Sequence, residues 1–83
     1  MDLVSIIMPT HNGEKYIKKV IQNLYEQTYK NFELIVIDDN SEDKTVEVIK
    51  KIANEFNNIK ILELKENLGP AIARNKGLEL VTR

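Results

Sequence analysis

The 83-residue sequence predicts an α/β fold: an open, parallel, three-stranded sheet with helices on both faces. Apolar residues dominate three short segments, 3–8, 33–37 and 59–64, as they do in buried parallel strands. Each segment is followed by a stretch in which apolar residues recur with helical spacing. Because right-handed crossovers join such units, we expect the strand order 3-2-1.

The first strand is predicted to end at Met8, because Pro9 lacks a backbone N–H, and a loop then runs to Gly13. A helix is expected over about residues 14–26, since its apolar residues share one face. That face is formed by Ile17, Val20, Ile21 and Leu24.

The second strand, residues 33–37, is followed by two acids, and Ser41 is the predicted N-cap of the next helix. The apolar residues of that helix continue to Phe56. A third strand follows over residues 59–64. The final helix, about 70–80, begins at Pro70, a residue suited to a first helical turn.

Composition limits the chain to one domain and to a few classes of partner. The net charge of -1 provides no long-range attraction for nucleic acid. The chain has no cysteine, so disulfides and thiolate metal sites are excluded. No apolar run is long enough to span a bilayer and no signal peptide is evident, so we expect a cytoplasmic protein without a membrane segment.

Asp38 and Asp39 follow the second strand, at the carboxyl edge where open α/β sheets bind ligands. There an acid can accept hydrogen bonds from a base N–H or a ribose hydroxyl. Successive strand residues point to opposite faces, so we expect at most one of the two in a given pocket. The alternative is that one or both cap the next helix.

Two other loops are expected at the same edge. His11 could stack on a base or bind a ligand, although a lone loop histidine is more often merely exposed to solvent. Gly69 and the helix N-terminus after it could seat a phosphate, with Arg74 one turn further in. The alternative is a Schellman-type loop and a surface arginine.

Taken in order, segments 4–12, 24–41 and 67–77 resemble the N-terminal part of the family-two glycosyltransferases, which have the GT-A fold. The resemblance covers essentially the whole chain and implies the Rossmann-like half of a GT-A domain. It also implies transfer of a sugar from a nucleoside diphosphate sugar to an acceptor, usually with inversion. Such enzymes serve cell-envelope or polysaccharide biosynthesis.

The resemblance assigns substrate-binding roles in the first loop. Pro9 and Thr10 would contact the nucleoside, and His11 stands where the family often has a tyrosine that stacks.

The remaining substrate-binding roles follow in the same way. Asp39 would hold the base or the ribose, with Asp38 secondary, and Arg74 would lie near the base or the diphosphate.

The family's Asp-X-Asp motif, which holds Mg or Mn on the diphosphate, follows the next strand, whereas this sequence stops at Arg83. We therefore expect residues 1–83 to be the N-terminal nucleotide-sugar-binding part of the domain, truncated before the motif. The catalytic base and the metal ligands would lie beyond it. The isolated chain is expected to be inactive and to bind no metal, while the full-length protein uses one.

Two other classes of protein remain open. One is a noncatalytic nucleotide-binding module that forms a homodimer through the exposed edge of the first strand. The other is a receiver-like signalling domain, which is disfavoured because the first strand ends in Met8-Pro9-Thr10 without an acid.

Overall fold

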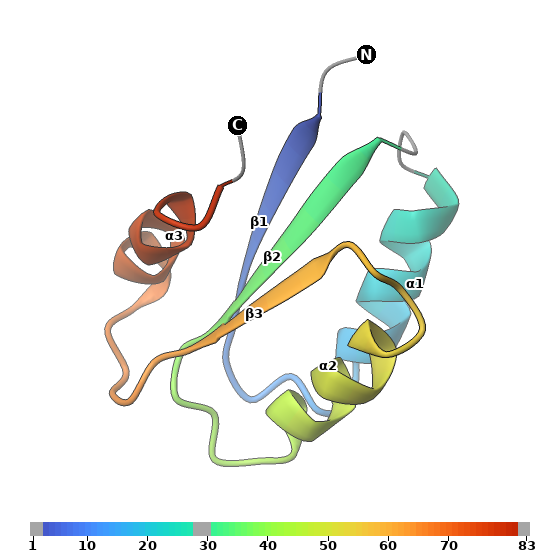
Figure 1. Ribbon diagram of the computed structural model, residues 1–83. Helices are drawn as coiled ribbons and strands as arrows, with labels where there is room; N and C mark the ends of the chain where they lie inside the picture. The colour runs from blue at the N-terminus through green and yellow to red at the C-terminus, as the bar shows by residue number, and fades with distance from the viewer. Residues whose placement is uncertain (1–2, 28–30, 82–83) are drawn as a thin grey trace.

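The structure is a computed structural model that describes residues 3–27 and 31–81. Three parallel strands form one sheet in the order β1-β2-β3, which confirms the predicted topology. Helices α1 and α2 cover one face of the sheet and α3 covers the other (Figure 1). The elements are β1 Val4–Thr10, α1 Ile17–Gln27, β2 Phe32–Asp38, α2 Thr45–Ala53, β3 Ile59–Glu63 and α3 Pro70–Leu78.

Strand β2 forms the centre of the fold, and all seven of its residues are buried. Its side chains alternate between two apolar clusters. Leu34 and Val36 pack beneath α1 and α2, whereas Ile35 and Ile37 pack beneath α3. This arrangement explains why the sequence of β2 is a continuous apolar run, since a strand covered on both faces has no solvent-facing side.

Strand β1 extends two residues beyond the predicted end at Met8, through Pro9 and Thr10. In this strand Val4 N–H donates to Asn31 O, and Thr10 O accepts from Asp39 N–H. The backbone N–H and C=O groups of the even-numbered residues therefore point toward β2. The backbone nitrogen of Pro9 therefore points to the open edge, where its missing N–H costs no ladder bond. A proline therefore does not end an edge strand when its backbone nitrogen points away from the neighbouring strand.

The helix boundaries differ from the predicted ones by a few residues. Helix α1 begins at Ile17 rather than near residue 14, although Ile17 N–H already bonds to Gly13 O. Ser41 is not the N-cap of α2, which is Lys44. The reason is that Ser41 is held by Asp38 three residues earlier, so the helix starts only after a further turn. Helices α2 and α3 also end earlier than predicted.

Gly77 is the point of closest approach between α3 and the sheet. A methyl group at this position would lie 2.5 Å from Ile37 Cδ1 and 2.9 Å from Ile7 Cγ2. The absence of a side chain therefore lets the helix lie directly on β1 and β2.

We expect Gly77→Ala to destabilise the fold, because overpacking costs roughly 1–3 kcal/mol. Alanine recovers only about 1 kcal/mol of helix propensity. Urea denaturation should show the loss as a lower free energy of unfolding. Asn75→Ala, on the exposed side of the same helix, is the matched control and should be neutral or stabilising. A Gly77→Ala protein as stable as the unmodified one would contradict this packing.

Candidate functional site

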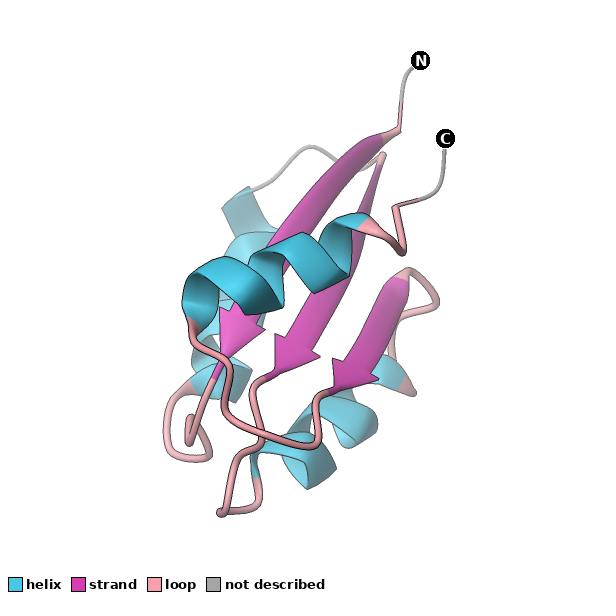
Figure 2. Cartoon of the chain, turned by 90° about the vertical axis from the view of Figure 1, so that its left-hand side faces the viewer, coloured by secondary structure: helices cyan, strands magenta, loops and turns pink. Residues whose placement is uncertain are grey.

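The carboxyl ends of the three strands meet at one edge of the sheet, as Figure 2 shows by its three arrowheads. Thr10 at the end of β1 lies opposite Asp38 at the end of β2. The next residue, Asp39, continues the pairing, since its N–H donates to Thr10 O at 2.8 Å. The loop between β3 and α3 crosses above this edge, so three loops that are distant in sequence are brought together.

Asp39 connects these loops through its carboxylate, although only 4% of the residue is exposed. Oδ1 accepts the N–H of Leu68 at 2.8 Å, and Oδ2 accepts that of Gly69 at 2.9 Å. Gly69 is the N-cap of α3, has φ +90° and supplies no side-chain cap. Asp39 thus caps α3 from 30 residues away and still has lone pairs free for a ligand.

The side chain of Asp38 faces the turn that follows β2, and the residue is 2% exposed. Its carboxylate accepts hydrogen bonds from the backbone N–H of Ser41, at 2.9 Å, and from the Ser41 hydroxyl. The alternative prediction, that one or both acids cap the next helix, α2, is therefore wrong. Neither caps α2: Asp38 closes the turn after β2, and Asp39 caps α3.

His11 is exposed, and both of its ring nitrogens have partners. Nδ1 lies 2.8 Å from Asp39 O, a carbonyl that can only accept, so Nδ1 carries the proton. Nε2 then accepts from the side-chain amides of Asn12, at 3.2 Å, and Asn67, at 3.4 Å. The tautomer is assigned from these partners.

An open pocket of about 120 Å³ lies among these loops. Four of the six predicted site residues line it, and Pro70 is an additional one that the sequence reasoning assigned only to the start of a helix. Pro70 reaches the pocket because the start of α3 packs over this edge of the sheet. No local sequence pattern specifies that packing. The lining residues are Pro9, Thr10, His11, Asp39 and Pro70.

The other two predicted site residues, Asp38 and Arg74, do not line this pocket. Arg74 lies on the exposed side of α3, and no hydrogen bond or ion pair joins it to another residue in the described ranges. Its predicted role at the base or the diphosphate therefore remains a prediction.

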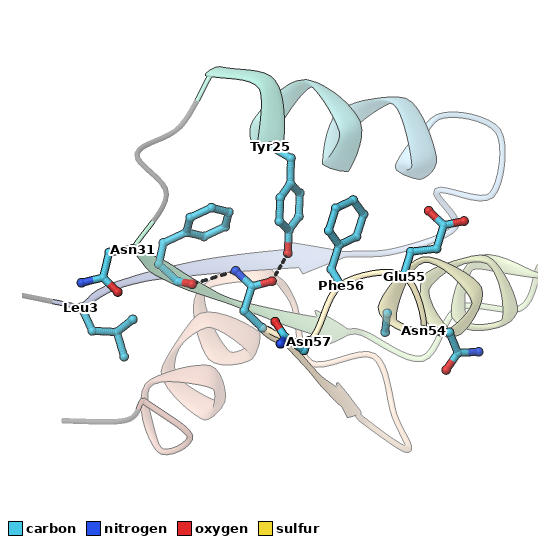
Figure 3. A pocket seen from close by; sticks show the side chains of 10 residues that line it. Leu3, Tyr25, Asn31, Asn54, Glu55, Phe56 and Asn57 are labelled. Carbon is cyan, nitrogen blue, oxygen red and sulfur yellow. Dashed lines mark hydrogen bonds between the residues drawn. The ribbon is translucent and has the colours of Figure 1, made fainter.

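A second, larger pocket of about 840 Å³ lies at the opposite edge of the sheet (Figure 3). Tyr25 stacks on Phe56 with ring centroids 4.0 Å apart and lies tilted against Phe32 at 5.0 Å. The Tyr25 hydroxyl donates to Asn58 Oδ1, while Asn58 Nδ2 donates to Phe32 O at 2.8 Å. The aromatic rings pack on one another, and the Asn58 amide uses its hydrogen bonds within the protein. These contacts indicate that the residues lining this pocket have a structural role.

No group of three or more His, Asp or Glu side chains within residues 3–27 and 31–81 could hold a metal ion. Among the same residues, no helix is long and apolar enough to cross a membrane.

Comparison with known proteins supplies the family. The family model described as "Glycosyl transferase family 2" matches residues 5–83. The chain belongs to this family. A glycosyltransferase of Haemophilus influenzae, itself uncharacterized, is 47% identical over 79 residues, which are 95% of this chain and 32% of that protein. The putative teichuronic acid biosynthesis glycosyltransferase TuaG of Bacillus subtilis is 36% identical, over 93% of this chain and 31% of its own length.

Solved structures agree with the GT-A assignment. Residues 1–349 of Staphylococcus aureus TarS superimpose with a TM-score of 0.84 at 36% identity, covering 99% of this chain and 25% of that one. Further structures of that fragment contain UDP or UDP-GlcNAc. The mannosyltransferase PcManGT of Pyrobaculum calidifontis, in complex with GDP-Man and Mn²⁺, gives a TM-score of 0.87 at 31% identity, covering 95% and 24%.

The chain spans about a third of the length of the two glycosyltransferases from Haemophilus influenzae and Bacillus subtilis and about a quarter of each of the two superimposed chains. Family membership shows that the chain is not a receiver-like signalling domain, and it confirms the resemblance on which the site residues were chosen.

We expect Asp39→Asn to loosen the start of α3, because an NH2 group, which cannot accept a hydrogen bond, replaces one of the two carboxylate oxygens that accept the N–H groups of Leu68 and Gly69. Hydrogen bonds to a charged group contribute about 1.5–3 kcal/mol, so the free energy of unfolding should fall by about that amount. Amide hydrogen exchange at Leu68 and Gly69 should rise at the same time. Glu66→Gln removes the same charge from an exposed residue of the same loop and should change neither quantity. Unchanged exchange in Asp39→Asn would disprove the capping role.

Burial raises the pKa of Tyr25 above its ordinary value of 10.0, although the hydrogen bond to Asn58 partly offsets this. The folded protein therefore holds the phenol proton more tightly than the unfolded chain, and stability falls as pH rises past about 10. Removing the hydroxyl in Tyr25→Phe should abolish this part of the alkaline loss.

Urea unfolding of the unmodified protein and of Tyr25→Phe, between about pH 8 and about pH 11, measures this loss. The difference between their free energies of unfolding should narrow as pH rises. Tyr16→Phe, at an exposed position, should leave the pH dependence unchanged. A stability difference that stays constant over this range would contradict the burial of the phenol.

Proposed function

We propose that this chain is the nucleotide-sugar-binding part of a glycosyltransferase domain, within residues 1–83, and that the whole protein transfers a sugar from a nucleoside diphosphate sugar to an acceptor. Inversion at the transferred sugar is expected from the family resemblance. The observation that carries the proposal is the pocket at the carboxyl edge of a GT-A sheet, lined by Thr10, His11 and Asp39.

The pocket supports the roles that the family resemblance implies, and we propose them for these residues. Pro9 and Thr10 contact the nucleoside, and the exposed ring of His11 offers a surface on which a base can stack. Asp39 is held rigidly by Leu68 and Gly69, so its free lone pairs are pre-oriented toward the base or the ribose. Rigid placement lowers the ordering cost of binding.

Asp38 acts indirectly, by closing the turn that follows β2. Arg74, exposed on α3, is proposed to lie near the base or the diphosphate, because its guanidinium has no competing partner in the described part of the chain.

The relatives support further proposals about the whole protein. TuaG and the minor teichoic acid biosynthesis protein GgaA, both of Bacillus subtilis, are named for envelope polymers, so we propose a cytoplasmic enzyme of cell-envelope polysaccharide synthesis. PcManGT is in complex with Mn²⁺, which supports divalent metal use in the whole protein. No group of three or more candidate ligands lies within the described residues, and we propose that the metal ligands of the whole protein lie elsewhere.

A noncatalytic binding module remains the alternative, because β1 pairs on one side only among the described strands. In that case two copies would join through the β1 edge. Sedimentation at high protein concentration distinguishes the two, since a strictly monomeric profile rules the homodimer out.

Titration with UDP and with GDP, each without and with Mn²⁺, tests the donor site. We expect amide chemical-shift changes clustered at Thr10, His11 and Asp39 and insensitive to Mn²⁺. His11→Ala should weaken nucleotide binding at least about fivefold, because stacking of a base on an aromatic ring contributes about 1–3 kcal/mol. Lys18→Ala, at an exposed position of α1, is the control and should bind normally. Absence of shifts at millimolar nucleotide would overturn the proposal for this chain.

A further inference from the structure

Asn12 is a residue of the first loop to which the site roles above give no part. Its φ is +51°, a conformation that asparagine adopts more readily than most residues. Its backbone N–H donates to Ser41 Oγ at 2.8 Å, and its side-chain Oδ1 accepts the N–H of Glu42 at 2.8 Å. Asn12 therefore joins the loop after β1 to the loop after β2.

The bond to Glu42 also fixes which end of the Asn12 amide faces His11. Because Oδ1 is engaged by a backbone N–H, which can only donate, the amide cannot flip, and Nδ2 must point to the ring. Nδ2 lies 3.2 Å from His11 Nε2 and, as a donor, requires a lone pair there. On the other side of the ring, the carbonyl of Asp39 requires a proton on Nδ1.

From these contacts we infer that Asn12 is a positioning residue that sets the tautomer and orientation of the His11 ring in the nucleotide pocket. The two fixed partners allow only one arrangement of the ring, in which Nδ1 donates to Asp39 O and Nε2 accepts from Asn12 Nδ2. A stacking surface held in one orientation before the base arrives loses less rotamer freedom on binding. The consequence for donor affinity rests on the proposed function, but the position of the ring proton does not.

Asn12→Asp is the sharpest test, because it changes one atom of the contact. A carboxylate at this position can still accept the N–H of Glu42, and aspartate also adopts positive φ. Toward His11, however, it presents an acceptor in place of a donor. We therefore expect the His11 ring to change its tautomer or its orientation in the variant, because the donor that its Nε2 accepted from is gone.

Asn40→Asp is the matched control. Asn40 also has positive φ, +57°, and is exposed in the neighbouring loop, and no hydrogen bond joins its side chain to another described residue. It introduces the same charge by the same chemical change but without contact to His11. His11 in this variant should keep the tautomer of the unmodified protein.

Nitrogen chemical shifts of the His11 ring, read by long-range ¹H–¹⁵N correlation without nucleotide, report the protonation of each ring nitrogen. His11 is the only histidine, so the signals need no further assignment. The unmodified protein should show the proton on Nδ1. A proton on Nε2 in the unmodified protein would overturn the inference even if Asn12→Asp failed to fold. Unchanged nitrogen shifts of the His11 ring in a folded Asn12→Asp protein would overturn it as well.

Nucleotide titration of the same proteins separates this inference from the proposed function. We expect Asn12→Asp to bind UDP or GDP about three- to tenfold more weakly, and Asn40→Asp to bind normally. If no protein binds nucleotide, the proposed function fails while the ring signals still decide the role of Asn12. If the ring changes state but affinity does not, Asn12 does not position the ring for binding, and that part of the inference is overturned.

Discussion

The complete burial of β2 is the constraint on which the rest of this structure depends. A strand covered on both faces requires helices above and below, and the two apolar clusters on its alternate side chains provide them. The strand then ends in two acids that are almost entirely buried. A buried carboxylate without hydrogen bonds is costly, so the loops around the end of β2 must supply donors.

The two acids meet this requirement differently, and the difference creates the site. Asp38 takes its donors from Ser41, three residues ahead, and so shapes only its own turn. Asp39 takes them from Leu68 and Gly69, in a loop that β3 and α2 separate from it in sequence. The same carboxylate thereby sets where α3 begins and keeps free lone pairs at the edge of the pocket.

Similarity to proteins whose structures contain UDP, UDP-GlcNAc or GDP-Man supports the proposal that this pocket binds a nucleotide. The family resemblance implies a tyrosine at position 11, where this chain has a histidine. A tyrosine has one polar atom, whereas His11 has two ring nitrogens, and both are held by neighbouring loops. The ring of His11 is therefore coupled to the turn after β2 and to Asn12.

The sequence by itself determined the order of elements, the parallel sheet and the edge of the sheet at which a pocket lies. These follow from continuous apolar runs, helical spacing and acids after a buried strand, all of which are local patterns. It also identified four residues that line the pocket. Only the tertiary structure decided that β1 continues through Pro9, that Ser41 serves Asp38 instead of α2, and that Asp39 caps α3. The continuation of β1 depends on which edge of the strand is open, and the contacts of Asp39 depend on partners about 30 residues along the chain, so no short-range pattern encodes them. The bond between Ser41 and Asp38 is local, but the same short pattern also fits an N-cap, and only the structure chose between the two.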